Sequence, residues 1–229
     1  RQEFALHRDR FDTFDTLYLG GGTPSVLDDD GLCGLVSTMV GQLESGGEIT
    51  VEANPDDLDE SRLARWREAG VNRLSLGIQS LDDGQLRWLG RRHDAHQARS
   101  AVVAARAVGL DELSLDFMYG LPGQSLDDWR ATLERAIALG PEHLSCYQLT
   151  YAAATPLGQQ MQRGELPCLD DEAARELFLT TSSVLRAAGY EHYEVSNFAR
   201  PGHRSRHNAK YWRRTPYLGL GPSAHSFDG

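Results

Sequence analysis

Apolar residues recur along the chain with two different spacings and predict strands that alternate with helices. Short apolar runs that stop at turn residues predict five strands, at about residues 16–20, 48–54, 73–79, 112–118 and 143–149. Apolar positions three or four residues apart predict the helices between them, at about residues 28–43, 59–70, 82–89, 94–108 and 125–139. Regular alternation of this kind is typical of an α/β fold with a parallel sheet.

The pattern changes after the fifth predicted strand. We expect an irregular loop over residues 152–168, a helix over about 170–188, and two short β-like pieces at about 209–213 and 216–220. No low-complexity tract separates these segments. We therefore expect a barrel-like core over residues 1–150 and an extension over residues 151–229 that does not form a second compact domain.

Polar residues stand at or just after the end of every predicted strand. They are Gly20 to Thr23, Glu52 with Asn54, Gln79, Asp116 and Gln148. The carboxyl ends of parallel strands meet at one edge of a sheet, so these residues predict a shared ligand site. The alternative for each is an ordinary solvated strand end, and for the glycines a tight turn without a ligand.

The residue types at this edge indicate which ligands it could bind. Glycines allow a ligand to approach the backbone closely, but no Gly-Lys-Ser/Thr follows, so a P-loop fits poorly. Glu52 and Asp116 are suited to accepting hydrogen bonds from sugar hydroxyls; two carboxylates alone are a poor metal cage. Arg91 is suited to pairing with a ligand carboxylate, the alternative being an arginine on a surface helix.

Composition excludes some partners. The 229 residues carry a formal net charge of −10, which argues against nucleic acid or an anionic membrane surface as the main partner. The basic cluster within residues 200–214 is either a solvated loop or a site for an anionic ligand such as a propionate. Cys33, Cys146 and Cys168 are isolated and suggest a reducing cytoplasm, and neither a signal peptide nor a membrane span is apparent.

Four motifs stand in the order and spacing of one family. They are Gly20-Gly21-Gly22-Thr23-Pro24-Ser25, Glu52-Ala53-Asn54-Pro55, Arg73-Leu74-Ser75-Leu76-Gly77-Ile78-Gln79-Ser80 and Asp116-Phe117-Met118-Tyr119-Gly120-Leu121-Pro122-Gly123. Together they resemble radical S-adenosylmethionine (SAM) proteins of the HemN/HemW group, which includes oxygen-independent coproporphyrinogen III oxidase and its heme-chaperone relative. The resemblance implies a partial (βα)6 TIM-like barrel without its first strand.

The resemblance also implies site residues. The methionine ammonium of S-adenosylmethionine would be held by Gly21, Gly22 and Thr23. Its ribose and carboxylate would be contacted by Glu52, Gln79, Arg91 and Asp116, with Gln148 approaching the cofactor from the last of these strands.

The segment His207-Asn208-Ala209-Lys210-Tyr211-Trp212 looks like the HNxxYW pattern of the heme-chaperone branch. His207 beside Tyr211 and Trp212 suits ligation of heme iron or stacking on a porphyrin, and Arg204 and Arg206 suit heme propionates. The alternative is a structural histidine in a β-turn.

One family feature is absent from the sequence. The CxxxCxxC motif that binds the [4Fe–4S] cluster does not occur, and five barrel strands are predicted where the family has six. We expect the chain as written to bind no cluster and to be a piece of a longer protein, truncated at both ends.

Three functions stay open, in this order. The first is a cytoplasmic heme chaperone that uses S-adenosylmethionine and a [4Fe–4S] cluster in its complete form and passes heme to apoproteins. The second is a radical enzyme that oxidatively decarboxylates coproporphyrinogen III. The third is a barrel without a cluster that binds a nucleoside.

Overall fold

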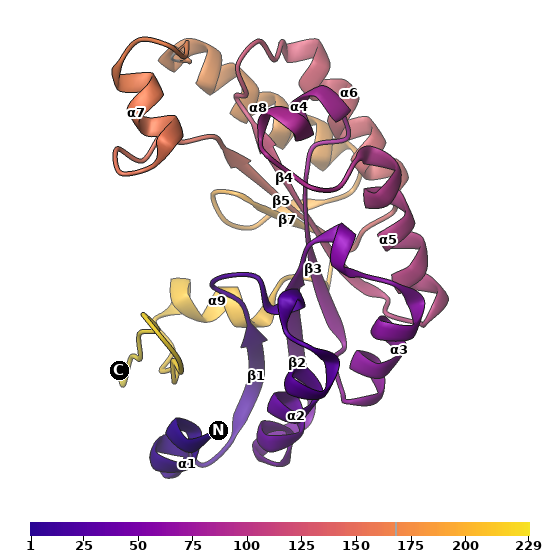
Figure 1. Ribbon diagram of the computed structural model, residues 1–229, viewed down its shortest axis with the longest axis vertical. Helices are drawn as coiled ribbons and strands as arrows, with labels where there is room; N and C mark the ends of the chain where they lie inside the picture. Colours follow the sequence, from indigo (N-terminus) through magenta and orange to yellow (C-terminus); the bar gives the residue numbers. More distant parts are fainter. Residues whose placement is uncertain (168) are drawn as a thin grey trace. The chain divides into compact units, whose positions relative to one another are not determined.

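The computed structural model describes residues 1–167 and 169–229, and strands alternate with helices along most of the chain (Figure 1). The strands are β1 (Phe14–Leu19), β2 (Leu43–Ala53), β3 (Arg73–Gln79), β4 (Glu112–Tyr119), β5 (His143–Gln148), β6 (Glu191–His192) and β7 (Asn197–Ala199). The helices are α1 (Gln2–His7), α2 (Asp29–Met39), α3 (Glu60–Glu68), α4 (Asp83–Trp88), α5 (Ala95–Ala107), α6 (Leu126–Ala138), α7 (Pro156–Gln162), α8 (Asp171–Ala187) and α9 (Arg206–Arg213). The predicted α/β class is confirmed.

The chain divides into two compact units, each of which we describe by itself. Unit 1 comprises residues 1–76, 101–113 and 204–229, and unit 2 comprises residues 77–100 and 114–203. The hydrogen-bonded strand order is β1-β2-β3-β4-β5-β7-β6. The predicted division at residue 150 stays a prediction.

In unit 1, β1 pairs in parallel with β2, and β2 with β3. Successive side chains of these strands point to opposite faces of the sheet. Apolar residues such as Val51 and Leu74 are fully buried, whereas the other face carries the polar residues Thr16, Glu48, Thr50 and Arg73. Helices α2 and α3 contribute further fully buried side chains, and each begins at an aspartate whose side chain accepts a backbone N–H of the first turn.

In unit 2, β4 and β5 are parallel, while β7 is antiparallel to both β5 and β6. Neither antiparallel pairing was part of the sequence prediction. Helix α6 begins at Ser125 with a capping box, as the serine and two following aspartates predict. Trp129 of α6 is fully buried and donates its Nε1–H to Thr181 Oγ1 of α8 at 2.7 Å, which ties the two helices together.

Two predictions about the later segments are wrong. Residues 156–162 form helix α7, which Thr155 caps and Pro156 starts, inside the segment predicted as an irregular loop. Residues 209–213 belong to helix α9 rather than to a β-like piece, so His207 is helical and not in a β-turn. The β-like piece predicted at residues 216–220 is confirmed only at Tyr217, which forms an antiparallel β-bridge with Phe227.

One physical reason applies to α9. Its aromatic residues, His207 and Asn208 have weak helix preference, but Ser205 Oγ accepts the Asn208 N–H at 3.2 Å and stabilises the helix start. Cys168, one of the three cysteines considered above, lies outside the described residues.

Candidate functional site

In unit 1, the loop Gly20–Thr23 follows β1 and is held by Glu52 at the end of β2. The Tyr18 hydroxyl donates to Glu52 Oε1 at 2.7 Å, and the Gly21 N–H donates to Oε2 at 3.2 Å. A Cβ at Gly20 would lie 2.5 Å from Tyr18 Cε1 and 2.7 Å from Glu52 Cδ, and Gly21 has a φ of +80°. Each Glu52 oxygen keeps acceptor capacity, because a carboxylate oxygen accepts two hydrogen bonds.

This loop lines a cavity of about 840 Å³ that lies wholly in unit 1. A Cβ at Gly21 or Gly22 would meet no atom within 4 Å, so the loop backbone is open to a ligand. The wall also includes residues of β1, α9 and the C-terminal segment, among them Thr16, Tyr18, His207, Tyr211 and Tyr217. The cavity thus joins the predicted ammonium site to the predicted heme histidine.

His207 lies in the first turn of α9 with both ring nitrogens in hydrogen bonds. Its Nδ1 is 2.9 Å from Thr16 Oγ1, its Nε2 is 3.0 Å from the Tyr211 hydroxyl, and its ring stacks on Tyr18 with centroids 4.9 Å apart. Burial, with a smaller effect of the nearby Lys210 charge, lowers the pKa of His207 from 6.5 to about 4. The imidazole is therefore neutral at pH 7, the form that ligates iron, but Nε2 must first exchange the Tyr211 hydroxyl for the metal.

The other two predicted heme residues have different surroundings. Tyr211 lines the cavity and packs edge-on against Tyr217, with ring centroids 4.8 Å apart. Trp212 is 63% exposed and does not line the cavity. The structure therefore brings His207 and Tyr211 together and leaves Trp212 on the surface.

Helix α9 is anchored to the polar face of unit 1 by residues that the sequence analysis missed. Buried Glu48 accepts the Arg206 N–H at 3.0 Å and the His207 N–H at 2.9 Å, and lies 3.8 Å from Arg73 Nη1. Lys210 Nζ is 2.5 Å from Asp15 Oδ1. A charged residue inside a strand predicted to be buried was the signal that could have identified Glu48.

The basic cluster of residues 200–214 is only partly available to an anionic ligand. Arg206 Nη2 lies 3.7 Å from Asp15, the same carboxylate that pairs with Lys210, and Arg206 Nη1 donates to the Gly46 carbonyl. The cluster is thus partly neutralised within unit 1, and the predicted propionate role of Arg204 and Arg206 stays a prediction.

In unit 2, Gln79 has a backbone conformation that few residues other than glycine adopt. Its φ is +67°, and the Ser80 N–H donates to the Ile78 carbonyl at 2.8 Å across it. A three-residue turn with positive φ is strained and is more frequent at functional sites. Arg91 Nη2 donates to the Gly77 carbonyl at 2.9 Å, so this arginine is tied to β3 and does not extend from a surface helix.

The strand register separates two other predicted residues of unit 2. Asp116 of β4 is opposite Ser145 of β5, whereas Gln148 is opposite Tyr119, which packs against Trp129. Directly opposite residues share a face and successive residues alternate, so Asp116 and Gln148 lie on opposite faces. Tyr147, which the sequence analysis missed, shares the Asp116 face; the cofactor role of Gln148 stays a prediction.

The described thiols do not form a cluster site. Cys33 lies on α2 of unit 1 and Cys146 in the core of unit 2, and burial raises the thiol pKa of both. Among residues 1–167 and 169–229, no group of three or more potential ligands is arranged to hold a metal ion. The described residues therefore do not fit a [4Fe–4S] cluster, which needs several converging thiolates.

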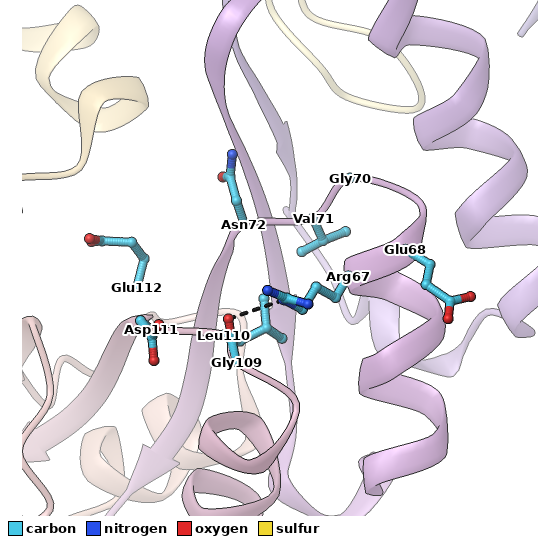
Figure 2. A pocket seen from close by; sticks show the side chains of 9 residues that line it. All are labelled: Arg67, Glu68, Gly70, Val71, Asn72, Gly109, Leu110, Asp111 and Glu112. Carbon is cyan, nitrogen blue, oxygen red and sulfur yellow. Dashed lines mark hydrogen bonds between the residues drawn. The ribbon is translucent and has the colours of Figure 1, made fainter.

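A second cavity, of about 380 Å³, lies in unit 1 at the amino ends of β3 and β4 (Figure 2). The turns that precede these two strands line the cavity. The Arg67 side chain, also in its wall, donates from Nε to the Gly109 carbonyl at 3.1 Å. Ligands of parallel sheets bind at the carboxyl ends of the strands. The Gly20–Thr23 cavity is therefore the better candidate.

Comparisons with known proteins identify the family of the chain. The sequence profile of the Radical SAM superfamily matches residues 2–136. The heme chaperone HemW of Escherichia coli is 41% identical over 212 residues, which cover 92% of this chain and 55% of that protein. The mouse mitochondrial radical S-adenosyl methionine domain-containing protein 1 is 42% identical over 213 residues, covering 92% of this chain and 48% of that protein.

Among solved structures, coproporphyrinogen III oxidase (HemN) of Escherichia coli superposes with a TM-score of 0.79 at 25% identity, covering 93% of this chain and 52% of that chain. The chain thus spans about half the length of the curated relatives it matches. Within the part that the structure describes, no helix combines the length and apolar character that a bilayer crossing requires.

Proposed function

Because this chain belongs to the radical SAM superfamily, we propose that it is the part of a HemW-like heme chaperone that binds S-adenosylmethionine and heme. The observation that carries the proposal is the cavity of unit 1. Its wall includes both the Gly20–Thr23 loop and His207 with Tyr211, so one space contacts the two predicted ligand-binding motifs.

The residues of the loop suit the methionine end of S-adenosylmethionine. An ammonium group only donates hydrogen bonds, so it needs acceptors, and the loop carbonyls with the Thr23 hydroxyl supply them. Glu52 adds a negative charge next to the loop and holds Gly21 in place. When bound, S-adenosylmethionine would supply radical chemistry in this superfamily; the chain's own contribution is to bind and orient it.

For unit 2 the proposal rests on the family resemblance alone. The resemblance assigns Asp116 to the ribose of S-adenosylmethionine, and Arg91 and Gln79 to polar contacts with it. His207 and Tyr211 contact the heme, and transfer of that heme to apoproteins is the proposed outcome. A reducing compartment such as the cytoplasm is part of the proposal, because Cys33 and Cys146 are free thiols.

S-Adenosylmethionine binding is tested by isothermal titration of the purified protein and its Gly22→Ala variant. The new methyl group meets no protein atom within 4 Å, so the fold is retained while the ligand space is reduced. We expect at least about a tenfold loss of affinity, a change of about 1.4 kcal/mol. Gly41→Ala is the matched control, since its Cβ is equally free of contacts and lies outside the cavity; equal affinities for the two variants would refute the loop assignment.

Heme binding is tested by titration followed in the Soret band. His207→Ala should weaken binding, whereas His225→Ala, at another histidine of the same cavity wall, should not. Loss of binding only in His225→Ala would reassign the ligand, and no heme binding by the unmodified protein would refute the chaperone proposal.

A second function is favoured by the structural similarity to coproporphyrinogen III oxidase. Because the described residues do not fit the [4Fe–4S] cluster that radical turnover requires, binding rather than turnover distinguishes the two in this chain. We expect heme to bind more tightly than coproporphyrinogen III in parallel titrations; tighter binding of coproporphyrinogen III would favour the oxidase, and binding of a nucleoside without heme would favour the third alternative.

A further inference from the structure

A chain of polar side chains in unit 2 leads from Asp116 to the segment between β6 and β7. Ser114 Oγ lies 3.5 Å from Asp116 Oδ1 and 2.7 Å from His143 Nδ1, and His143 Nε2 lies 2.8 Å from the Tyr193 hydroxyl. The His143 and Tyr193 rings also meet edge-on, with centroids 5.7 Å apart. This network was not predicted from the sequence.

The network is built into the fold. Ser114 and His143 are directly opposite in the β4–β5 pairing, and Ser114 is two residues before Asp116, so all three lie on one face. Ser114 is 4% exposed and His143 is 1% exposed, so solvent does not compete for their hydrogen bonds. Buried polar networks of this kind restrict side-chain orientation strongly.

We propose that Tyr193 and His143 are positioning residues that orient the Ser114 hydroxyl toward Asp116. A neutral imidazole has one N–H and one bare nitrogen. When the Tyr193 hydroxyl donates to Nε2, the ring proton is on Nδ1 and is donated to Ser114 Oγ. The Ser114 proton is then directed to the Asp116 carboxylate, which is held in the orientation that accepts a ribose hydroxyl.

Loss of the Tyr193 hydroxyl removes the preference for the Nδ1–H tautomer. The ring proton of His143 then shifts toward Nε2, so Nδ1 accepts the Ser114 proton that Asp116 otherwise receives. The inference rests on the proposed role of Asp116 in S-adenosylmethionine binding, and its test separates the two.

The test compares S-adenosylmethionine affinities of Tyr193→Phe, Asp116→Asn and the double variant. We expect Tyr193→Phe to weaken binding about fivefold and to have no further effect in the Asp116→Asn background. Tyr190→Phe is the matched control, because its hydroxyl also donates a buried hydrogen bond, to the Pro141 carbonyl at 2.7 Å, without reaching Asp116. An equal loss in Tyr190→Phe, or an effect of Tyr193→Phe that persists beside Asp116→Asn, would overturn the inference.

A second readout reports the tautomer directly. The ¹⁵N chemical shifts of His143 should show the Nδ1–H tautomer in the unmodified protein and a shift toward Nε2–H in Tyr193→Phe. An Nε2–H tautomer in the unmodified protein would overturn the inference even if Asp116→Asn abolishes binding. Unchanged binding in Asp116→Asn would instead refute the proposed role of Asp116, and the inference with it.

Discussion

Replacing Glu48 by alanine should release helix α9 from the sheet of unit 1. The carboxylate is buried and accepts the N–H groups of Arg206 and His207 at 3.0 Å and 2.9 Å, in the first turn of the helix. These donors have no partner within the helix, and the positive end of the helix dipole stabilises the negative charge. Arg73, only 3% exposed, would retain Glu112 as its acidic partner at 3.2 Å.

The magnitude follows from these contacts. A hydrogen bond to a charged group contributes about 1.5–3 kcal/mol. Because Arg73 keeps Glu112 as its partner, no buried charge is left uncompensated, and we expect Glu48→Ala to lower the free energy of unfolding by about 1.5–3 kcal/mol. Glu48→Gln keeps one acceptor oxygen and should have a smaller effect.

Urea unfolding measures the change in the free energy of global unfolding. Amide hydrogen exchange of residues 206–213 measures the change in the local stability of α9. Exchange in α9 should accelerate in Glu48→Ala and heme affinity should fall, since His207 lies on this helix. Glu44→Ala is the control, because Glu44 is an exposed carboxylate on the same strand. A change in unfolding free energy below about 1 kcal/mol with unaltered exchange in α9 would refute the anchoring role of Glu48.

Three further predictions concern strain, pH and a buried hydrogen bond. Gln79→Gly should raise the free energy of unfolding by about 1 kcal/mol relative to Gln79→Ala in urea titrations, because glycine adopts a φ of +67° without strain. Because the pKa of His207 falls from 6.5 to about 4 on folding, the unfolded chain binds the proton more tightly, so stability is retained above about pH 6.5 and lost as the pH falls toward 4. After allowance for partial exposure, urea unfolding near pH 5 should show a loss of about 1 kcal/mol that is absent in His207→Gln. Thr181→Val should cost about 1–3 kcal/mol of unfolding free energy, because Trp129 Nε1 loses its acceptor at 2.7 Å, and the same substitution at Thr180 should cost less.

The alternating α/β pattern and the strand-end residues could be predicted from the sequence because both depend on local order. Strand β3 was predicted at residues 73–79 and is observed there, and the caps at Asp59 and Ser125 follow from side chains three residues from the groups they bind. The order and spacing of four motifs identified the family, which the match over residues 2–136 confirms.

Tertiary structure alone decided the details of the candidate site. Helix α9 has a sequence that favours no structure strongly, and its start is stabilised by Glu48, 158 residues away in the chain from Arg206. Register decided that Gln148 is on the face opposite Asp116, since the side-chain period of a strand cannot show which residue of a neighbouring strand it meets. The contact of Thr16 with His207, 191 residues apart, likewise depends on how distant segments pack, which no local pattern encodes.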